Sequence, residues 1–406
     1  MQTAPSIRTD VLGHLRYLAA DIGPRPAGSA ANRAAGVYIA SVFRNAGLDV
    51  EEQTVEYPDW QVNATNLRLG EETLTAVANR FSPSADVSGP TVALCSVAEL
   101  ERAELAGKIA VLYGNLTSDQ LIALNYTIYN PEHDQHINQL LRARQPAAIL
   151  TVSAKPGNLD DRIADWDLNI PSATVSAEAG RTLLQHTGQM AHLRIEATSK
   201  PGTTGNVVAR KPGTRASKLV LCAHYDTRAG APGACDNGSG VAILLALAER
   251  FAAAPLSATL EFVAFTDEEY YGWADGLYIE RAGDSFWDTI AAINVDGVGP
   301  WLSTTTATAM VHSPALQAVV DETLALTPGM IWTEPWPQSN HSTFAFRGIP
   351  AIALTSSPLP FNLHQADDTL DGINPAKLDE AVGFIARLVE ALHDKPTEWA
   401  RAPQPE

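Results

Sequence analysis

The sequence predicts a mixed α/β protein with a mainly parallel central sheet covered by helices on both faces. From about residue 204 onward, short apolar runs alternate with longer segments of helical periodicity. The short runs are apolar throughout rather than at every second position, which is typical of strands buried on both faces of a parallel sheet. Strands that alternate with helices along the chain form such a sheet, because each crossover helix packs against one face.

The expected elements follow one another in a regular order. The strands are 219–223, 260–265, 291–295 and 350–354, and the helices are 238–252, 314–326 and 375–392. Near the N-terminus, apolar residues at helical spacing predict a helix over 9–20, with Thr9 or Asp10 as its cap. A second helix is expected from Ser29 to about Asn45, and Gly47 ends it.

The middle of the chain has a different character. Residues 85–200 contain short apolar strands with polar spacers, such as "GKIAVLYG" and "AAILTV", and the segment "SAEAGRTLLQHTG" is the main helix signal. We therefore expect a discontinuous α/β domain formed by 1–84 and 201–406, with a β-rich domain inserted at 85–200.

Composition excludes several classes of function. The 406 residues carry a formal net charge of −18, which argues against nucleic acid and anionic membranes as partners, because both require a positive surface. No apolar stretch reaches the roughly 18–20 residues of a membrane span. Three cysteines form no disulfide framework, although a Cys222–Cys235 bridge is conceivable. No signal peptide is visible, so we expect a cytoplasmic protein, or a secreted one if a leader was removed.

Polar side chains follow four of the expected strands at the point where each strand ends. The chain places His224 and Asp226 after the first, Glu268 and Glu269 after the second, Asp296 after the third and His364 after the fourth, with Asp236 just before a helix. The carboxyl ends of the strands in an open parallel sheet border the crevice where ligands bind. These side chains should therefore gather at one edge.

Each of these residues also has an ordinary structural interpretation. Glu268 and Glu269 could begin a solvated helix, whereas Asp236 and Asp296, each near a glycine, could be turn or cap residues. Their repetition at equivalent strand ends favours a shared site instead. Two histidines with several carboxylates suit zinc or a similar divalent ion. One catalytic zinc takes about three protein ligands, so five candidates suit two ions that share a carboxylate.

Two adjacent glutamates cannot both point the same way at the end of an extended strand. One of Glu268 and Glu269 can therefore bind metal while the other reaches a water molecule. A carboxylate beside the ion is suited to take the proton of that water.

Several motifs together resemble one known family. The segments "AHYDT", "GACDNGSG", "FTDEEYYG", "NVDGVG", "NHSTFAFRGIPAIAL" and "LHQADDTLD" are similar to those of the co-catalytic zinc aminopeptidases of the M28 metallopeptidase family. The resemblance covers roughly 10–60 and 205–392. It implies the zinc-exopeptidase fold, two zinc ions and a peptide substrate with a free N-terminus. The inserted region is similar to a protease-associated domain, and an unrelated β-rich insertion is the alternative.

The resemblance also implies a role for each site residue. His224 and Asp296 would bind one zinc, Glu269 and His364 the other, and Asp236 would bridge them. The general base would be Glu268, and Asp226 would orient His224. The Asp236–Asn237 peptide matches a bond that is cis in relatives, and His341 matches a histidine near the substrate. An acid usually precedes that histidine, and this chain has Asn340 there instead.

Other functions stay open beside a di-zinc aminopeptidase. A glutaminyl-cyclase-like acyltransferase shares the fold but normally works with one zinc, and the M28 family also contains carboxypeptidases and dipeptidases. A binding protein that has lost its metals is a third class, although none of the ligand positions or Glu268 is missing here. Acidic residues at the strand ends favour recognition of an α-ammonium group and hence an aminopeptidase. A first residue such as Leu or Phe is expected if nearby aromatic side chains line a pocket rather than the core.

Overall fold

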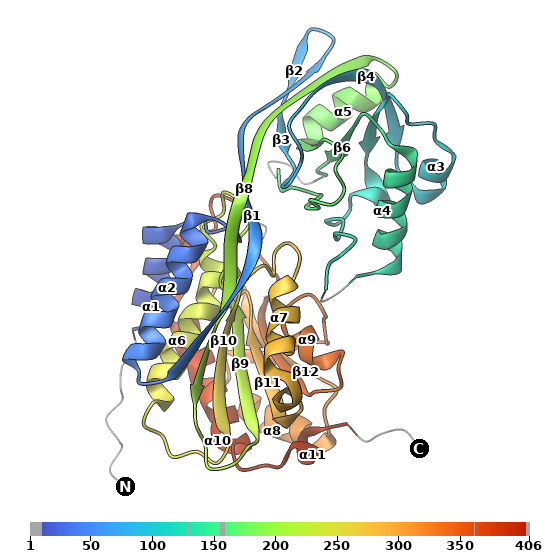
Figure 1. Ribbon diagram of the computed structural model, residues 1–406. Helices are drawn as coiled ribbons and strands as arrows, with labels where there is room; N and C mark the ends of the chain where they lie inside the picture. Colours follow the sequence, from blue (N-terminus) through green and yellow to red (C-terminus); the bar gives the residue numbers. More distant parts are fainter. Residues whose placement is uncertain (1–9, 128–129, 155–158, 361, 403–406) are drawn as a thin grey trace. The chain divides into compact units, whose positions relative to one another are not determined.

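The structure is a computed structural model that describes residues 10–127, 130–154, 159–360 and 362–402. The chain divides into two units, one formed by Met1–Tyr57 with Thr203–Glu406 and the other by Pro58–Gly202. Two long strands, β1 (Asp49–Leu69) and β8 (Met190–Lys211), have residues in both units (Figure 1). Each unit is described below by itself.

Four parallel strands form the centre of the first unit. They are ordered β14 (Ala351–Ser357), β11 (Thr289–Val295), β9 (Lys218–His224) and β10 (Thr259–Phe265). Antiparallel neighbours lie at both sides: β8 pairs with β10, and β12 (Thr304–Met310) pairs with β14. Strand β13 (Met330–Trp332) then pairs with β12 in parallel. The prediction of a mainly parallel central sheet is confirmed, and the antiparallel strands are confined to its margins.

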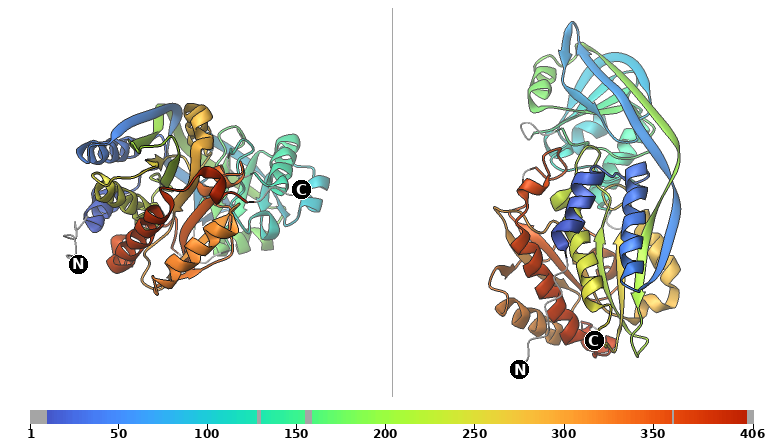
Figure 2. Two further views of the ribbon diagram at one scale, coloured as in Figure 1. Left: turned by 90° about the horizontal axis from the view of Figure 1, so that it is seen from below. Right: turned by 90° about the vertical axis from the view of Figure 1, so that its left-hand side faces the viewer.

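Helices cover both faces of this sheet (Figure 2). One face carries α1 (Val11–Arg16), η1 (Tyr17–Ile22), α2 (Ala30–Asn45), α6 (Ser239–Phe251), α8 (Pro314–Ala325) and α10 (Pro375–Leu392); the other carries α7 (Trp273–Ala282), η4 (Gly283–Asp288) and α9 (His341–Ala345). Strand β9 shows how its residues divide between the two layers. Leu219 and Leu221 pack in the core with α6, whereas Val220 packs with Tyr278 and Phe344 on the opposite face. Alternating side chains point to opposite faces, so an apolar run fits only a strand covered twice.

Helix starts agree with the predicted caps. The Ser29 hydroxyl accepts the backbone N–H of Asn32 at 3.0 Å at the start of α2, and Gly47 follows the helix with a φ of +78°. Asp10 caps α1 by accepting the Gly13 N–H at 2.8 Å, whereas Thr9, the alternative cap, lies outside the described residues. The remaining short elements of this unit are η3 (Ala234–Gly238), η5 (Leu370–Gly372) and α11 (Thr397–Ala400).

The second unit has its own small sheet and core. Strands β4 (Ala85–Leu94), β5 (Ile109–Leu112), β6 (Ala148–Val152) and β7 (Ser172–Val175) are parallel, and β3 (Ala76–Ala78) runs antiparallel to β7. Between and after them lie α3 (Val97–Arg102), η2 (Gly114–Leu116), α4 (Glu132–Arg144) and α5 (Ala177–Gln185), while β2 (Glu72–Leu74) pairs with β1.

This unit contains more helix than the sequence predicts. Only α5 corresponds to the main helix signal in "SAEAGRTLLQHTG". Helix α4 has the sequence "EHDQHINQLLRAR", in which Ile137 and Leu141 are buried among mostly polar neighbours, so its apolar stripe is too narrow to stand out. The unit begins at Pro58 rather than near residue 85. Its identity as a protease-associated domain stays a prediction.

Two further properties concern the described residues of the whole chain. Among them, no helix is long and apolar enough to cross a membrane. Cys95, Cys222 and Cys235 are all free thiols, so the conceivable Cys222–Cys235 bridge is absent from the described structure.

Candidate metal centre

The carboxyl ends of the four central strands meet at one edge of the first unit and bring the predicted site residues together. His224 is the last residue of β9, and Asp296 directly follows β11. Glu268 and Glu269 lie in the turn after β10, and His364 lies in the segment after β14. Asp236 belongs to η3, the turn that leads into α6.

Asp236 stands between the two histidines. Its Oδ1 is 3.2 Å from His224 Nε2, and its Oδ2 is 3.0 Å from His364 Nε2. The peptide bond between Asp236 and Asn237 is cis. One carboxylate thus presents each of its oxygens to a different imidazole, which is the arrangement a carboxylate needs to bridge two ions.

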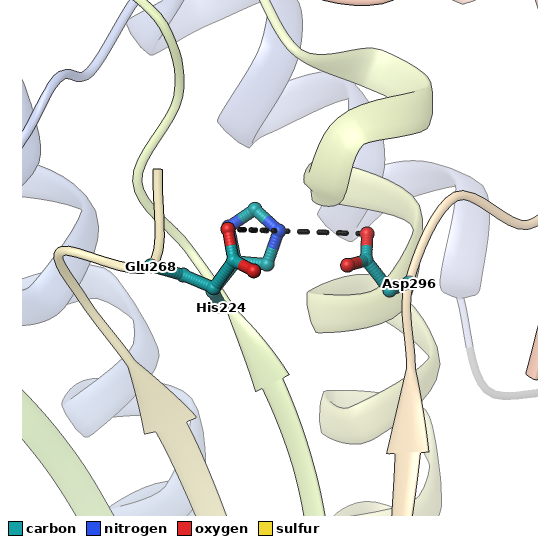
Figure 3. Close-up of side chains that lie close together, drawn as sticks. All are labelled: His224, Glu268 and Asp296. Carbon is teal, nitrogen blue, oxygen red and sulfur yellow. Dashed lines mark ion pairs between the residues drawn. The ribbon is translucent and has the colours of Figure 1, made fainter. Parts of the chain in front are cut away.

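Two further predicted ligands, Asp296 and Glu269, and the predicted base Glu268 lie close to the two histidines. Asp296 Oδ1 is 3.4 Å and Glu268 Oε2 is 3.9 Å from His224 Nε2, so the imidazole lies between these two carboxylates (Figure 3). Glu269 Oε2 is 3.4 Å from His364 Nε2. Two groups of three side chains hold their ligand atoms within 4.8 Å of one another: His224 with Glu268 and Asp296, and His224 with Asp236 and Glu269.

The donor atoms and the charge of this cluster fit metal ions. His224 Nε2 and Glu269 Oε1 are buried and have no hydrogen-bond partner among the described residues, although a buried polar group normally has one. Burial raises the pKa of Glu268 well above its ordinary value, with His224 opposing and Asp296 adding to the effect. Burial alone would lower the pKa of His224, but Asp296 and Glu268 outweigh it and hold that pKa well above its usual range. The carboxylates of this cluster outnumber its histidines, so the cluster attracts positive charge.

Asp226 organises the turn that carries the two glutamates. Its Oδ1 accepts the Glu268 N–H and its Oδ2 accepts the Glu269 N–H, each at 3.3 Å. The distance from His224 Nδ1 to Asp226 Oδ1 is 3.6 Å, and the same nitrogen is 3.3 Å from the Asp226 backbone carbonyl. Asp226 is completely buried. It lies beside His224 and also holds the backbone of Glu268 and Glu269.

The neighbouring Asp267 shapes the same turn from the other side. Its φ is +65°, and its carboxylate accepts the N–H groups of Tyr271 and Trp273 at 3.1 and 3.0 Å. The hydroxyl of Tyr57 donates to Asp267 Oδ1 at 2.5 Å. Two carboxylates, Asp226 and Asp267, therefore fix the main chain on both sides of Glu268.

His341 lies apart from the ion-paired cluster. It begins α9, is completely buried, and its Nε2 donates to the Trp336 carbonyl at 2.5 Å. Burial lowers the pKa of His341 to about 4. Asn340, which replaces the family acid, donates to both oxygens of Asp275 at 3.0 Å. The acid of this region is thus supplied by Asp275 on α7, a residue that the sequence analysis did not select.

Two further charged residues support the site and were missed. Asp368 lies four positions after His364 and accepts the N–H groups of Cys235 and Asp236 at 2.8 and 3.1 Å. Arg25 is completely buried and donates to backbone carbonyls of Leu18, Gly23, Tyr225, Pro232 and Gly233. Asp368 and Arg25 could both have been noticed in the sequence. Asp368 stands inside "LHQADDTLD", and Arg25 is a charged residue within the turn "GPRPAGS".

The comparison with known families agrees with this geometry. Residues 206–389, which contain all the predicted metal ligands, match the family model of peptidase family M28. This stretch of the chain is similar to the peptidases of family M28. The predicted resemblance is thereby confirmed.

Curated relatives of the chain are named as aminopeptidases. Aminopeptidase YwaD of Bacillus subtilis is 26% identical over 277 residues, which are 66% of this chain and 57% of that protein. The probable lipoprotein aminopeptidase LpqL of Mycobacterium tuberculosis is 26% identical over 288 residues, 66% of this chain and 54% of that protein. The chain thus spans a little over half the length of the curated relatives it matches.

Solved structures share the fold over almost the whole chain. An aminopeptidase from Aneurinibacillus sp. strain AM-1 aligns with a TM-score of 0.78 at 22% identity and covers 98% of this chain and 97% of its own. BSAP, a zinc aminopeptidase from Bacillus subtilis, aligns with a TM-score of 0.75 at 21% identity, covering 95% of each chain. These similarities establish the fold of the first unit and that of the second unit.

Proposed function

We propose that this protein is a di-zinc aminopeptidase that removes residues from the N-terminus of peptides. The bridging position of Asp236 carries the proposal, because its two oxygens face two different histidines at 3.2 and 3.0 Å. His224 and Asp296 would hold one zinc, and Glu269 and His364 the other. Zinc at such a site polarises a carbonyl group and lowers the pKa of water, as hydrolysis of a peptide bond requires.

The protein's own groups supply the proton transfers. Glu268 lies next to the candidate ligands, with its Oε2 3.9 Å from His224 Nε2. It takes the proton of the attacking water and passes it to the nitrogen of the leaving amine. Asp226 keeps Glu268 in place by accepting its backbone N–H at 3.3 Å.

Charge around the cluster supports recognition of a free N-terminus. An α-ammonium group needs acidic neighbours, and the strand ends provide several carboxylates. A carboxypeptidase would need a cation for the substrate carboxylate. Arg228 is already bonded to Glu269 at 2.8 Å, and exposed Arg347 donates to the Thr343 carbonyl at 2.9 Å. This distribution favours an aminopeptidase over a carboxypeptidase.

Two observations bear on whether the enzyme prefers substrates with an apolar first residue. Tyr270 and Tyr271 are buried and belong to the core, which weakens the interpretation that they line an open pocket. Leu359 is 55% exposed and lies against Gly297, the residue that follows Asp296. An exposed leucine next to a ligand segment suits contact with an apolar side chain.

The glutaminyl-cyclase-like alternative is not favoured. Both curated relatives described above are named as aminopeptidases, and the chain retains a complete set of candidate ligands for two ions. A cyclase normally works with one zinc, for which five candidate ligands are too many.

One experiment tests the proposal directly. The purified full chain is loaded with zinc, its metal content is measured, and hydrolysis of Leu-anilide is compared with that of N-acetyl-Leu-anilide and of an N-acetylated peptide with a C-terminal Leu. We expect about two zinc ions per chain and cleavage of the unblocked anilide only. Saturation at one zinc, or release of the C-terminal residue from a blocked peptide, would contradict it.

A further inference from the structure

One buried arginine bonds both ends of the loop that separates His224 from Asp236. Arg25 is completely buried in the turn between η1 and α2. Its guanidinium nitrogens donate to three carbonyl groups of this loop, residues 225–233: Tyr225 at 2.7 Å, Pro232 at 2.6 Å and Gly233 at 3.1 Å. One planar group thus holds the start and the end of the loop together.

The guanidinium is itself fixed within the N-terminal region. Its Nη1 also donates to the carbonyls of Leu18 and Gly23 at 3.3 and 3.2 Å, and the Arg25 backbone N–H donates to Thr227 Oγ1 at 3.0 Å. Burial lowers the pKa of Arg25 to about 10, with Asp368 as the strongest opposing charge, so the group stays charged at neutral pH. Hydrogen bonds from a charged donor are stronger than those between neutral groups. The loop is therefore anchored firmly to the turn that carries Arg25.

Both ends of the loop connect directly to candidate metal ligands. Tyr225 follows His224 in the chain. At the other end, the Gly233 carbonyl also accepts the Gly238 N–H at 2.9 Å and so closes η3, the turn that contains Asp236. Gly233 has a φ of +61°, and a Cβ there would collide with the Asp236 carbonyl oxygen. A shift of either end of the loop would therefore change the distance between His224 Nε2 and Asp236 Oδ1, which is 3.2 Å.

We propose that Arg25 is a positioning residue that sets the spacing of His224 and Asp236 and so prepares the centre to bind metal. This inference rests on the proposed function, since it assumes that these two side chains are zinc ligands. A guanidinium presents several N–H groups in a rigid plane, so it can keep three carbonyls at a fixed spacing, whereas the single ammonium of lysine cannot. A site that is ordered in advance binds its ligand more tightly, because less ordering remains to be done on binding.

The first test replaces the planar group with a point charge. The zinc affinity of the metal-free full chain is measured by competition with a chromophoric chelator, and the visible spectrum is recorded after loading with Co²⁺. Arg25→Lys keeps the positive charge, yet its zinc affinity should fall by about 10–100-fold, as is typical when a residue that supports a metal ligand is lost. The cobalt spectrum should change as well, because it reports the geometry of the ligands.

Arg33→Lys is the matched control. Arg33 also bonds a backbone carbonyl, that of Gly28 at 2.8 Å, but among the described residues it donates to no carbonyl of the loop. Its zinc affinity and cobalt spectrum should match those of the wild type. Chemical denaturation measures the folding stability of both variants. If Arg25→Lys lost stability while the folded protein kept wild-type zinc affinity and the wild-type cobalt spectrum, Arg25 would have only a structural role and the inference would be overturned.

A second measurement needs no zinc. Hydrogen–deuterium exchange of the backbone amides of residues 225–233 is followed in the metal-free chain. We expect exchange at least about tenfold faster in Arg25→Lys than in the wild type, with Arg33→Lys unchanged, and equal rates would overturn the inference. If Arg25→Lys does not fold, the wild type decides. Zinc should slow its exchange in this loop by less than about threefold, because Arg25 already orders the loop, and a larger slowing would show that zinc orders it instead.

The outcomes separate this inference from the proposed function. A wild-type chain that binds no zinc contradicts the proposed function itself. A wild-type chain that binds zinc, together with a folded Arg25→Lys variant of unchanged zinc affinity, contradicts only the role of Arg25.

Discussion

The carboxylate of Asp368 accepts the backbone N–H of Asp236 at 3.1 Å and so holds the residue that lies between His224 and His364. Its second oxygen accepts the Cys235 N–H at 2.8 Å. Asp368 and His364 lie in the same segment after β14, so one stretch of chain both provides a ligand and fixes the bridging residue. The main chain around Asp236 thus depends on a residue far away in sequence.

Replacing Asp368 should therefore weaken metal binding. Asp368→Asn retains only one carbonyl oxygen for two N–H groups, and loss of such support typically costs about 10–100-fold in metal affinity. Leaving a buried N–H without a partner should also cost about 1–3 kcal/mol of folding stability. Zinc competition and chemical denaturation measure the two effects. Asp367→Asn, a change at the exposed neighbour, is the control, and equal zinc affinity in both variants would contradict this role.

Glu268 and Glu269 should respond differently to the same substitution. Glu268→Gln keeps the size of the side chain but removes the base, so kcat should fall by about 10²–10⁴ with zinc content unchanged. Glu269→Gln should lower zinc content instead. Steady-state kinetics and elemental analysis distinguish the two, with Glu280→Gln on the exposed side of α7 as control. Substantial kcat in Glu268→Gln would show that another group acts as the base.

Removal of metal should destabilise the first unit. Without cations the buried carboxylates repel one another, whereas an ion that binds only the folded state stabilises it by about 2.7 kcal/mol at 100 times its dissociation constant. We expect a chelator to lower the melting temperature and added zinc to restore it. Magnesium at the same concentration should restore little, because the histidine ligands favour zinc. A melting temperature that is insensitive to the chelator would argue against metal in the folded protein.

A buried ion-pair network away from the site should control acid stability. Glu261 on β10 bonds Lys218 Nζ at 2.7 Å and Arg210 Nε at 2.5 Å. Burial raises the pKa of Glu261, but the charges of Lys218 and Arg210 outweigh it and keep that pKa below its ordinary value. Glu261→Gln leaves Lys218 buried without its partner, so it should cost about 3–5 kcal/mol at neutral pH.

The contribution of Glu261 to folding stability depends on pH with a definite sign. Because the folded-state pKa of Glu261 is lowered, its contribution is present above the pKa of the unfolded chain, about 4.3, and is lost as the pH falls through the folded-state value. The difference in unfolding free energy between wild type and Glu261→Gln should therefore shrink between about pH 6 and about pH 3. Glu390→Gln, in an exposed pair with Arg250 at 3.8 Å, should change stability by less than about 1 kcal/mol at either pH. A constant difference across this range would refute the assignment.

The sequence by itself determined the fold class and the metal ligand candidates. Fully apolar strands can exist only between two helical layers, so runs such as 219–223 define the sheet without further information. Because parallel strands end at the same edge, the residues that follow them, such as His224 and Asp296, are brought together by topology alone. The caps at Ser29 and Asp10 are likewise local, since each depends on backbone groups within three residues.

Only the tertiary structure decided how the site is supported. Asp368 and Arg25 act through backbone N–H and carbonyl groups, which every sequence contains, so the motifs that hold these two residues do not reveal their partners. The contact between Arg228 and Glu269 joins residues from the ends of two strands, and a side chain's partner across such a distance depends on rotamers and packing. Helix α4 went unpredicted because its burial comes from the surrounding core rather than from a strong apolar stripe.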